Sequence, residues 1–436
     1  MRFALRPVGL AYGLAIALML AGIAAGCAGG PPTTSTTRPP DTTSSIGAST
    51  TTTEQPVVRI GSLFPLTGDL AERGAECAAG VQLAVNEVNA AGGIRSLGGV
   101  RLEVVGADSE GKPDIGVART EDLVKKDHVS AIVGAYQSTV ALPVSQAVEA
   151  MGTPLVLSVG AADKLTEQGL KFTFRLCAKA DWYARAQVQF LSDPTNLGGL
   201  NVTKVALLHE DGDFGEATAA SQKKYLAEAG IAMVMEQTYS ATTADVHEQV
   251  LAIKSSGAEA ILTATYLSDA LLIADAYQKL TMQLPVLDAA GGTVDPEFVE
   301  KLGAGADGFL TELDYSAGQK GATEVAARFK AAYGYEMSAN ALYSYQAVWV
   351  IADALERTAS SDPQRLRDSI AATSMLPGEH MVLPQTVLDF DAKGQNRFAQ
   401  LFVAQIQSSK MVCLWPQDYA TGAVRLNGAG AAGVNP

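Results

Sequence analysis

The sequence is poor in the residues from which catalytic and metal sites are built. Its 436 residues include 4 histidines and 4 cysteines, and we find no G-x-S-x-G, Walker A, H-E-x-x-H or paired C-x-x-C motif. The histidines stand singly, without the spacing of metal ligands. We therefore expect no metal, no cofactor and no catalytic residue, and we predict that the protein is not an enzyme.

Positive charge is also scarce. The chain has 32 Lys and Arg against 46 Asp and Glu, a formal net charge of -14. This balance argues against nucleic acid and anionic lipid surfaces as partners. After the first apolar stretch, no second run is long enough to span a bilayer, so the rest of the chain is expected to be soluble.

The N-terminal region has the pattern of an export signal. Two arginines precede an uncharged apolar stretch at residues 10–23, and the small residues before Cys27 resemble a bacterial lipobox. We predict a signal peptide over residues 1–26 and a lipid on Cys27, with a signal cut elsewhere or a retained membrane anchor as alternatives. Residues 27–56, rich in Thr, Ser and Pro, are predicted to form a disordered tether. The protein is thus expected to be exported and held at the outer face of the cytoplasmic membrane by lipid alone.

Strand and helix patterns alternate along residues 57–436. This length exceeds what one hydrophobic core usually covers, so two domains are expected. Alternation of this kind predicts an α/β fold whose parallel sheets are covered by helices on both faces. The predicted strands are residues 57–64, 100–105, 131–134, 154–157, 172–176, 204–209, 232–239, 260–264, 285–287 and 308–314.

Three cysteines follow Cys27 in the chain. Because export permits disulfides, a bond between Cys77 and Cys177 is possible. Cys77 falls in the first turn of the helix predicted after the first strand, and Cys177 falls just after the strand at residues 172–176, so both could lie near one edge of the sheet. Buried free thiols are the alternative for this pair and for Cys413.

Short motifs in a fixed order run through residues 57–422. They comprise Ile60, Gly61, Pro65, Gly68, Gly74, Asn86, Glu87, Asn89, Gly92, Gly93, Asp108, Gly134, Gln137, Ser138, Thr139, Pro154, Ser158, His209, Phe214, Gly215, Trp415 and Pro416. Each motif is weak alone, but their order and spacing resemble the substrate-binding proteins of branched-chain amino acid ABC importers.

The resemblance implies a type I periplasmic binding protein fold. Two Rossmann-like lobes would be joined by three crossovers, with the ligand in the cleft between them. Because the crossovers make the lobes discontinuous, we expect one lobe at residues 57–175 plus 315–375 and the other at 176–314 plus 376–420. Residues 421–436 would form a C-terminal tail.

The resemblance also implies a ligand site. A loop that leaves a parallel strand and opens a helix presents free amides, which favour a carboxylate. Phe214 and Tyr266 match positions that pack on the ligand, although both could be core aromatics. The residues implied to bind the ligand carboxylate are Gln137, Ser138, Thr139, Ser158, Gly160 and Ala161; a plain helix cap is the alternative for the loop.

Departures from the family pattern bear on the ligand's identity. Ala162 stands where leucine binders have Thr, and Ala290 stands where they have the Glu that faces the ligand ammonium. Asp288 is the expected substitute for that Glu, unless it is a solvated loop acid. Arg73 is unusual at its position and is expected to meet an extra ligand carboxylate or polar oxygen, unless it is merely an exposed arginine of the first helical turn.

These observations predict a binding protein that works as a monomer. It would capture a small polar solute, an amino acid or a similar compound, by hinge closure and pass it to an ABC permease. The alternatives are a ligand-binding sensory lipoprotein, a binder of amides or ureas, and an extracellular hydrolase.

Overall fold

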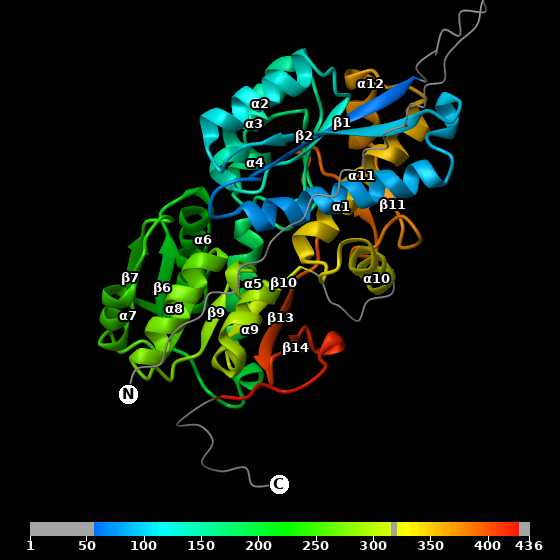
Figure 1. The fold of residues 1–436 in the computed structure, drawn as a ribbon. Helices are drawn as coiled ribbons and strands as arrows, with labels where there is room; N and C mark the ends of the chain where they lie inside the picture. The colour runs from blue at the N-terminus through cyan, green and yellow to red at the C-terminus, as the bar shows by residue number, and fades with distance from the viewer. Residues whose placement is uncertain (1–55, 315–320, 427–436) are drawn as a thin grey trace, which may run out of the picture. The chain divides into compact units, whose positions relative to one another are not determined.

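The computed structural model describes residues 56–314 and 321–426. The predicted signal peptide, Cys27 and nearly all of the predicted tether lie outside the described residues, as does most of the predicted C-terminal tail. Within the described ranges the chain forms two large sheets, one of five and one of seven strands, and a small third sheet of two (Figure 1).

The five-stranded sheet is parallel throughout, in the order β2-β1-β3-β4-β5. Most residues of β1 are buried, which is expected of a parallel strand covered on both faces. The strands are β1 (Val57–Phe64), β2 (Arg101–Asp108), β3 (Ala131–Gly134), β4 (Leu155–Leu157) and β5 (Thr173–Arg175).

Helices from both early and late parts of the sequence cover this sheet. One core joins α1 and β1 with α11 and α12, and in Figure 1 the gold and orange late helices lie among the blue and cyan early elements. The close crossing of α1 and α11 requires Gly80, because a Cβ there would lie 2.2 Å from the carbonyl oxygen of Ala341. The helices around this sheet are α1 (Ala71–Ala90), α2 (Pro113–Lys125), α3 (Ser138–Met151), α4 (Lys164–Glu167), α10 (Ala322–Tyr333), α11 (Ala339–Thr358) and α12 (Pro363–Ala371).

The seven-stranded sheet has the order β14-β13-β10-β9-β8-β6-β7. Its strands from β7 to β10 are parallel, whereas β13 and β14 form an antiparallel hairpin at one edge. Its strands are β6 (Lys204–Glu210), β7 (Ala232–Tyr239), β8 (Ala260–Ala264), β9 (Val286–Asp288), β10 (Leu310–Leu313), β13 (Phe402–Gln407) and β14 (Lys410–Trp415).

Helices α5 to α9 accompany the seven-stranded sheet and form two cores with it. They are α5 (Ala180–Ser192), α6 (Asp213–Ala229), α7 (His247–Lys254), α8 (Leu267–Lys279) and α9 (Pro296–Leu302). The small sheet pairs β11 (Ser374–Met375) with β12 (Leu388–Asp389). Two sheets built mainly on parallel strands, each packed with helices, confirm the predicted α/β fold class.

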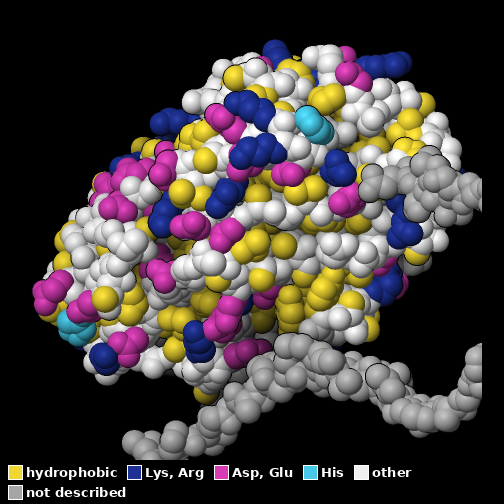
Figure 2. Space-filling model, turned by 45° about the horizontal axis from the view of Figure 1, so that its top comes forward, with side chains coloured by type: hydrophobic (Ala, Val, Ile, Leu, Met, Phe, Trp, Pro, Cys, Tyr) yellow, Lys and Arg dark blue, Asp and Glu magenta, His cyan; other side chains and the backbone are white. Residues whose placement is uncertain are grey.

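The surface carries charges of both signs. On the face in Figure 2, acidic and basic side chains are interspersed, and the Lys and Arg side chains do not gather into one basic patch. Across residues 56–314 and 321–426, no helix combines the length and the apolar character needed to cross a membrane.

Cys77, Cys177 and Cys413 are free, buried thiols, so the disulfide considered between Cys77 and Cys177 is not formed in this structure. Each of the two thiols has a different neighbour. The Cys77 thiol contacts Ser344 of α11, and Cys177 Sγ lies 3.8 Å from the carbonyl oxygen of Gly160. Burial raises the pKa of both thiols to about 12, which leaves them protonated and unreactive.

Candidate functional site

A pocket lies where the carboxyl ends of parallel strands from both large sheets meet. Its volume is about 70 Å³. Tyr136 and residues 158–161 follow β3 and β4, whereas residues 265–267 and 289–292 follow β8 and β9. The carboxyl ends of strands are where open α/β sheets bind ligands, because the helix N-termini with their free amides lie there.

Two buried serines form the polar wall on the side of the five-stranded sheet. Ser138 begins α3, and its Oγ accepts a hydrogen bond from the amide of Ala162 at 3.2 Å. Ser158 lies with its Oγ 2.9 Å from Ser344 Oγ. Both serines, together with Gly160 and Ala161, line the pocket, so four of the six residues expected to meet a carboxylate are brought together.

Gln137 and Thr139 do not line this pocket. Successive side chains at a helix start point in different directions, so only Ser138 of the three faces the cavity. The Gln137 amide reaches the carbonyl oxygen of Gly111 at 3.5 Å, and the Thr139 methyl lies near Gly212. Of the three loop residues that were expected to bind the ligand, only Ser138 therefore lines the pocket.

Aromatic rings form the opposite side of the pocket. The rings of Phe214 and Tyr266 lie 5.8 Å apart. Tyr136, which follows β3 on the side of the serines, faces them with its ring 6.3 Å from that of Tyr266. Phe214 and Tyr266 also belong to a buried cluster, so each has a core role as well as a pocket surface. Tyr136 was missed by the sequence reasoning, although its place directly after β3 could have indicated it.

Tyr266 is held in place by a buried acid. Its backbone amide donates to Asp269 Oδ1 at 2.8 Å, and Asp269 Oδ2 accepts from the Tyr239 hydroxyl at 2.6 Å. Burial is the largest cause that raises the pKa of Asp269 to about 7. These contacts fix the start of α8 beside the pocket.

Asp288 does not face the pocket, which corrects the expectation that it would replace the missing family Glu. It is 0% exposed, and its carboxylate accepts hydrogen bonds from the hydroxyls of Thr263 at 2.7 Å, Thr265 at 3.0 Å and Thr293 at 2.8 Å. With its oxygens already satisfied, Asp288 anchors the loop that lines the pocket and is not itself part of the lining.

Arg73 lies outside the pocket lining as well. Its guanidinium contacts Asp295 at 2.6 Å, Glu76 at 3.1 Å, Glu297 at 3.1 Å and Glu72 at 3.4 Å. Both terminal nitrogens of the guanidinium contact carboxylates, so its positive charge is already paired within the protein. Arg73 instead connects α1 with the start of α9, and its partner Asp295 is the residue of this cluster that lines the pocket.

Asp314 and Tyr183 also line the pocket and were missed by the sequence reasoning. Asp314 directly follows β10, and its Oδ2 accepts a hydrogen bond from the Tyr183 hydroxyl at 3.2 Å. Burial raises the pKa of Asp314 to about 6.

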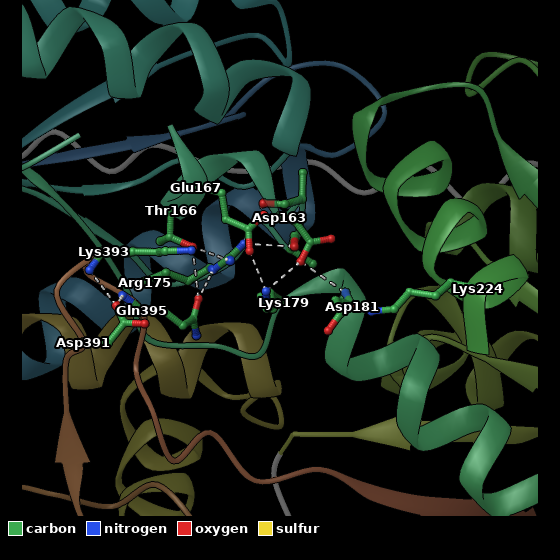
Figure 3. Close-up of polar contacts among 12 residues, drawn as sticks. Asp163, Thr166, Glu167, Arg175, Lys179, Asp181, Lys224, Asp391, Lys393 and Gln395 are labelled. Atoms are coloured by element: carbon green, nitrogen blue, oxygen red, sulfur yellow. Dashed lines mark hydrogen bonds and ion pairs between the residues drawn. The ribbon is translucent and has the colours of Figure 1, made fainter. Parts of the chain in front are cut away.

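A fully buried arginine lies behind the loop at residues 160–162 (Figure 3). Arg175 Nη1 donates to the carbonyl oxygens of Ala161 at 2.9 Å and Ala162 at 2.7 Å. Its other nitrogens reach Thr166 Oγ1 at 2.9 Å and Gln395 Oε1 at 2.6 Å. Burial lowers the pKa of Arg175 from its ordinary value. The loop is thereby fixed with its carbonyls turned toward the guanidinium.

Metal ligation finds no support in this geometry. Among residues 56–314 and 321–426, no group of three or more His, Cys, Asp or Glu side chains is placed to hold an ion. The pocket can instead offer hydroxyls, a helix N-terminus, aromatic rings and the carboxyl groups of Asp295 and Asp314 to a small polar molecule.

The sequence over residues 57–410 matches the family described as periplasmic binding protein. The chain belongs to this family. Proteins of the family act outside the cytoplasmic membrane and bind substrates for ABC transporters; they are not enzymes. The match confirms the family resemblance read from the sequence.

Individual relatives agree with the family. The chain is 29% identical over 381 residues to the Leu/Ile/Val-binding protein homolog 7 of Brucella melitensis, covering 85% of this chain and 94% of that protein. A substrate-binding protein of Streptococcus pneumoniae, LivJ, solved with isoleucine, has a TM-score of 0.72 at 24% identity and covers 82% of this chain and 98% of its own. A solute-binding protein of R. palustris, solved with benzoate, has a TM-score of 0.70 at 20% identity, covering 82% and 96%. These structures confirm the type I binding-protein fold.

Proposed function

We propose that this protein is an extracytoplasmic lipoprotein that captures a small carboxylate-bearing solute, an amino acid or a similar compound, and delivers it to an ABC importer. The observation that carries the proposal is the pocket at the carboxyl ends of both parallel sheets. One wall offers Ser138, Ser158 and the loop held by Arg175, and the other offers aromatic rings.

A carboxylate is the ligand group that best fits the serine wall. The N-terminus of α3 and the hydroxyl of Ser138 are donors placed for an anion. Arg175 adds a positive charge behind the same loop. Within the described residues, no carboxylate lies within ion-pair distance of its guanidinium. The ligands solved with two structural neighbours, isoleucine and benzoate, share a carboxylate group.

Capture would proceed by closure of two lobes, at residues 57–175 plus 315–375 and 176–314 plus 376–420. A ligand that contacts both walls favours the closed state, because the open state lacks half of those contacts. In support, the pocket takes its lining from loops of both sheets. A lipid on Cys27 and a tether over residues 27–56 would keep this monomeric binding protein beside its permease.

Calorimetric titration would test the carboxylate proposal. The panel would hold leucine, isoleucine, valine, benzoate and 4-hydroxybenzoate, with urea and isobutyramide as uncharged compounds. We expect binding only among the carboxylates, and Ser138→Ala should weaken it about tenfold through the loss of one charge-assisted hydrogen bond. Ser145→Ala is the matched control, because this buried serine of the same helix donates within α3 to Leu142.

Two results would overturn the proposed function. One is that no carboxylate binds the wild-type protein. The other is that Ser138→Ala and Ser145→Ala weaken binding equally, which would place the effect in the stability of α3 and not in the pocket.

A further inference from the structure

A buried ion pair joins two helices that belong to different cores. Arg73 Nη1 lies 2.6 Å from Asp295 Oδ2, and each of the two residues is 8% exposed. Arg73 lies in the first turn of α1, which packs with the five-stranded sheet, whereas Asp295 directly precedes α9, which packs with the seven-stranded sheet. The pair therefore connects the two large sheets through residues that are 222 apart in the chain.

The ion pair also separates the pocket from a second, outer cavity. The outer cavity has a volume of about 690 Å³ and is lined by the first turn of α1, by α9 and by the segment before α11. It opens to solvent, since Glu72 and Tyr335 of its lining are exposed. Of the two cavities, Asp295 lines only the pocket, whereas Arg73 and the two residues after Asp295 line only the outer cavity. The contact between Arg73 and Asp295 is thus part of the partition between the pocket and solvent.

The acid of this pair is fixed by its own helix. Asp295 Oδ1 accepts a hydrogen bond from the amide of Glu297 at 2.9 Å and caps α9, which leaves Oδ2 for Arg73. Arg73 stands near the N-terminus of α1, where the helix dipole disfavours a cation. The acids around it, two of which come with α9, stabilise the guanidinium at this position.

Each helix also supplies a partner that remains when the two helices separate. Arg73 contacts Glu76 of α1 at 3.1 Å. Glu297 contacts Lys301 of α9 at 2.5 Å. Asp295 would keep its hydrogen bond to the α9 amide and gain water. The contact between α1 and α9 can therefore form and break without leaving the guanidinium as an unpaired buried charge, which would be strongly unfavourable.

We propose that Arg73 and Asp295 form a latch that holds the pocket closed between α1 and α9 and slows the release of a bound solute. The two helices must separate for the pocket to open into the outer cavity, and this separation breaks the pair. The role in solute release rests on the proposed function, whereas the latch itself can be tested on the ligand-free protein. Arg73 is a positioning residue, since it does not line the pocket.

Hydrogen–deuterium exchange of the ligand-free protein tests the latch. Asp295→Asn should raise the exchange rate of amides at residues 158–162 and 289–294 about tenfold, because these pocket loops become accessible to solvent more often. Asparagine is also a good helix cap, so the substitution removes the charge that pairs with Arg73 and keeps the start of α9. Strand β7, at the far edge of the seven-stranded sheet, should exchange as in the wild type, which distinguishes opening of the pocket from general unfolding.

Glu76→Gln is the matched control. Glu76 contacts the same guanidinium nitrogen as Asp295, but it does so from α1 itself, so its loss leaves the contact between the helices in place. We expect this variant to show the wild-type exchange rate at both pocket loops.

Stopped-flow measurement of solute release supplies the functional readout. The probes are those carboxylates of the calorimetric panel that bind the wild-type protein. Arg73→Met should raise their release rates about tenfold, and Glu76→Gln should leave them unchanged. Arg73 is the residue to change here, because Asp295 lines the pocket and its substitution would alter the ligand's surroundings directly.

The outcomes separate the latch from the proposed function. If Asp295→Asn exchanges like the wild type at both pocket loops, or if Glu76→Gln raises exchange as much as Asp295→Asn, the latch is overturned. If Arg73→Met releases the probes at the wild-type rate, the role in release is overturned. If no carboxylate binds the wild-type protein, the proposed function is overturned, and the exchange experiment still decides whether the latch exists.

Discussion

Two buried arginines in this protein are stabilised in opposite ways. Arg73 has four carboxylates within 3.4 Å, whereas Arg175, which is 0% exposed, has no carboxylate partner within the described chain. The donors of Arg175 reach main-chain carbonyls, a threonine hydroxyl and the Gln395 side-chain amide (Figure 3). The charge of Arg73 is thus balanced by carboxylates, whereas the guanidinium of Arg175 is held by hydrogen bonds to uncharged groups.

The difference fits what each arginine connects. Arg175 fixes the loop at residues 160–162, which must keep one shape to present Ser158 and its neighbours to a ligand. Arg73 joins α1 to α9, two helices that accompany different sheets. An ion pair tolerates small displacements better than a set of directional hydrogen bonds, so it would suit a contact between the two lobes if they close as proposed.

The largest expected effect comes from Arg175→Met. The substitution leaves the carbonyls of Ala161 and Ala162, Thr166 and Gln395 buried without their donor, and each such group costs about 1–3 kcal/mol. We expect the free energy of unfolding, measured by denaturant titration, to fall by at least about 4 kcal/mol. Arg185→Met, on the exposed face of α5, should change it by less than about 0.5 kcal/mol. Equal losses would show that the carbonyl network has no special role.

Arg73→Met should have a smaller effect that depends on pH. It leaves Asp295 and Glu76 without their cation, and we expect a loss of about 2–3 kcal/mol at pH 8. Burial already raises the pKa of Glu76 to about 7 despite the opposing charge of Arg73. Without that charge the pKa of Glu76 and of Asp295 rises further, so both carboxyls take up protons as the pH falls and the loss shrinks at pH 5.5.

The same pH comparison on Arg175→Met sharpens the contrast. Its hydrogen-bond partners are carbonyls, a hydroxyl and an amide, which do not titrate, and the nearby acids Asp163 and Glu167 interact with it only through space. Its loss should therefore change less between pH 8 and pH 5.5 than the loss from Arg73→Met. A loss from Arg73→Met that does not change with pH would show that the carboxylates around Arg73 are not held ionised by it.

The parallel strands were the part of the fold best predicted from sequence. β1 was predicted at its observed bounds, because a buried parallel strand is a continuous apolar run that ends at turn residues. The hairpin of β13 and β14 was missed. Its turn is made by Ser408 and Ser409 with φ of 51° and 60°, a conformation usually signalled by Asn or Gly.

The pocket residues that could be predicted from the sequence are those that follow the carboxyl end of a parallel strand. Ser138 and Ser158 lie at strand ends, and the structure places both in the pocket. The surroundings of Arg73 could not be predicted from the sequence, because its ion-pair partner Asp295 is 222 residues away in the chain. Asp314 was also missed, although its place directly after β10 could have indicated it; only its contact with Tyr183, 131 residues away, could not be read from the sequence.

The smallest expected effect comes from the exposed member of the Arg73 cluster. The Glu72 side chain is 76% exposed and lies 3.4 Å from Arg73, so water competes for both charges. Exposed pairs contribute little, and Glu72→Ala should change the free energy of unfolding by less than about 0.5 kcal/mol at pH 8. Asp295→Asn, which alters the buried partner at 2.6 Å, is the comparison and should cost more than Glu72→Ala in the same titration. If Glu72→Ala lowered the free energy of unfolding as much as Asp295→Asn, the exposed fraction of a carboxylate would not determine how strongly it pairs with Arg73. The acids around Arg73 would then have to be treated as one network.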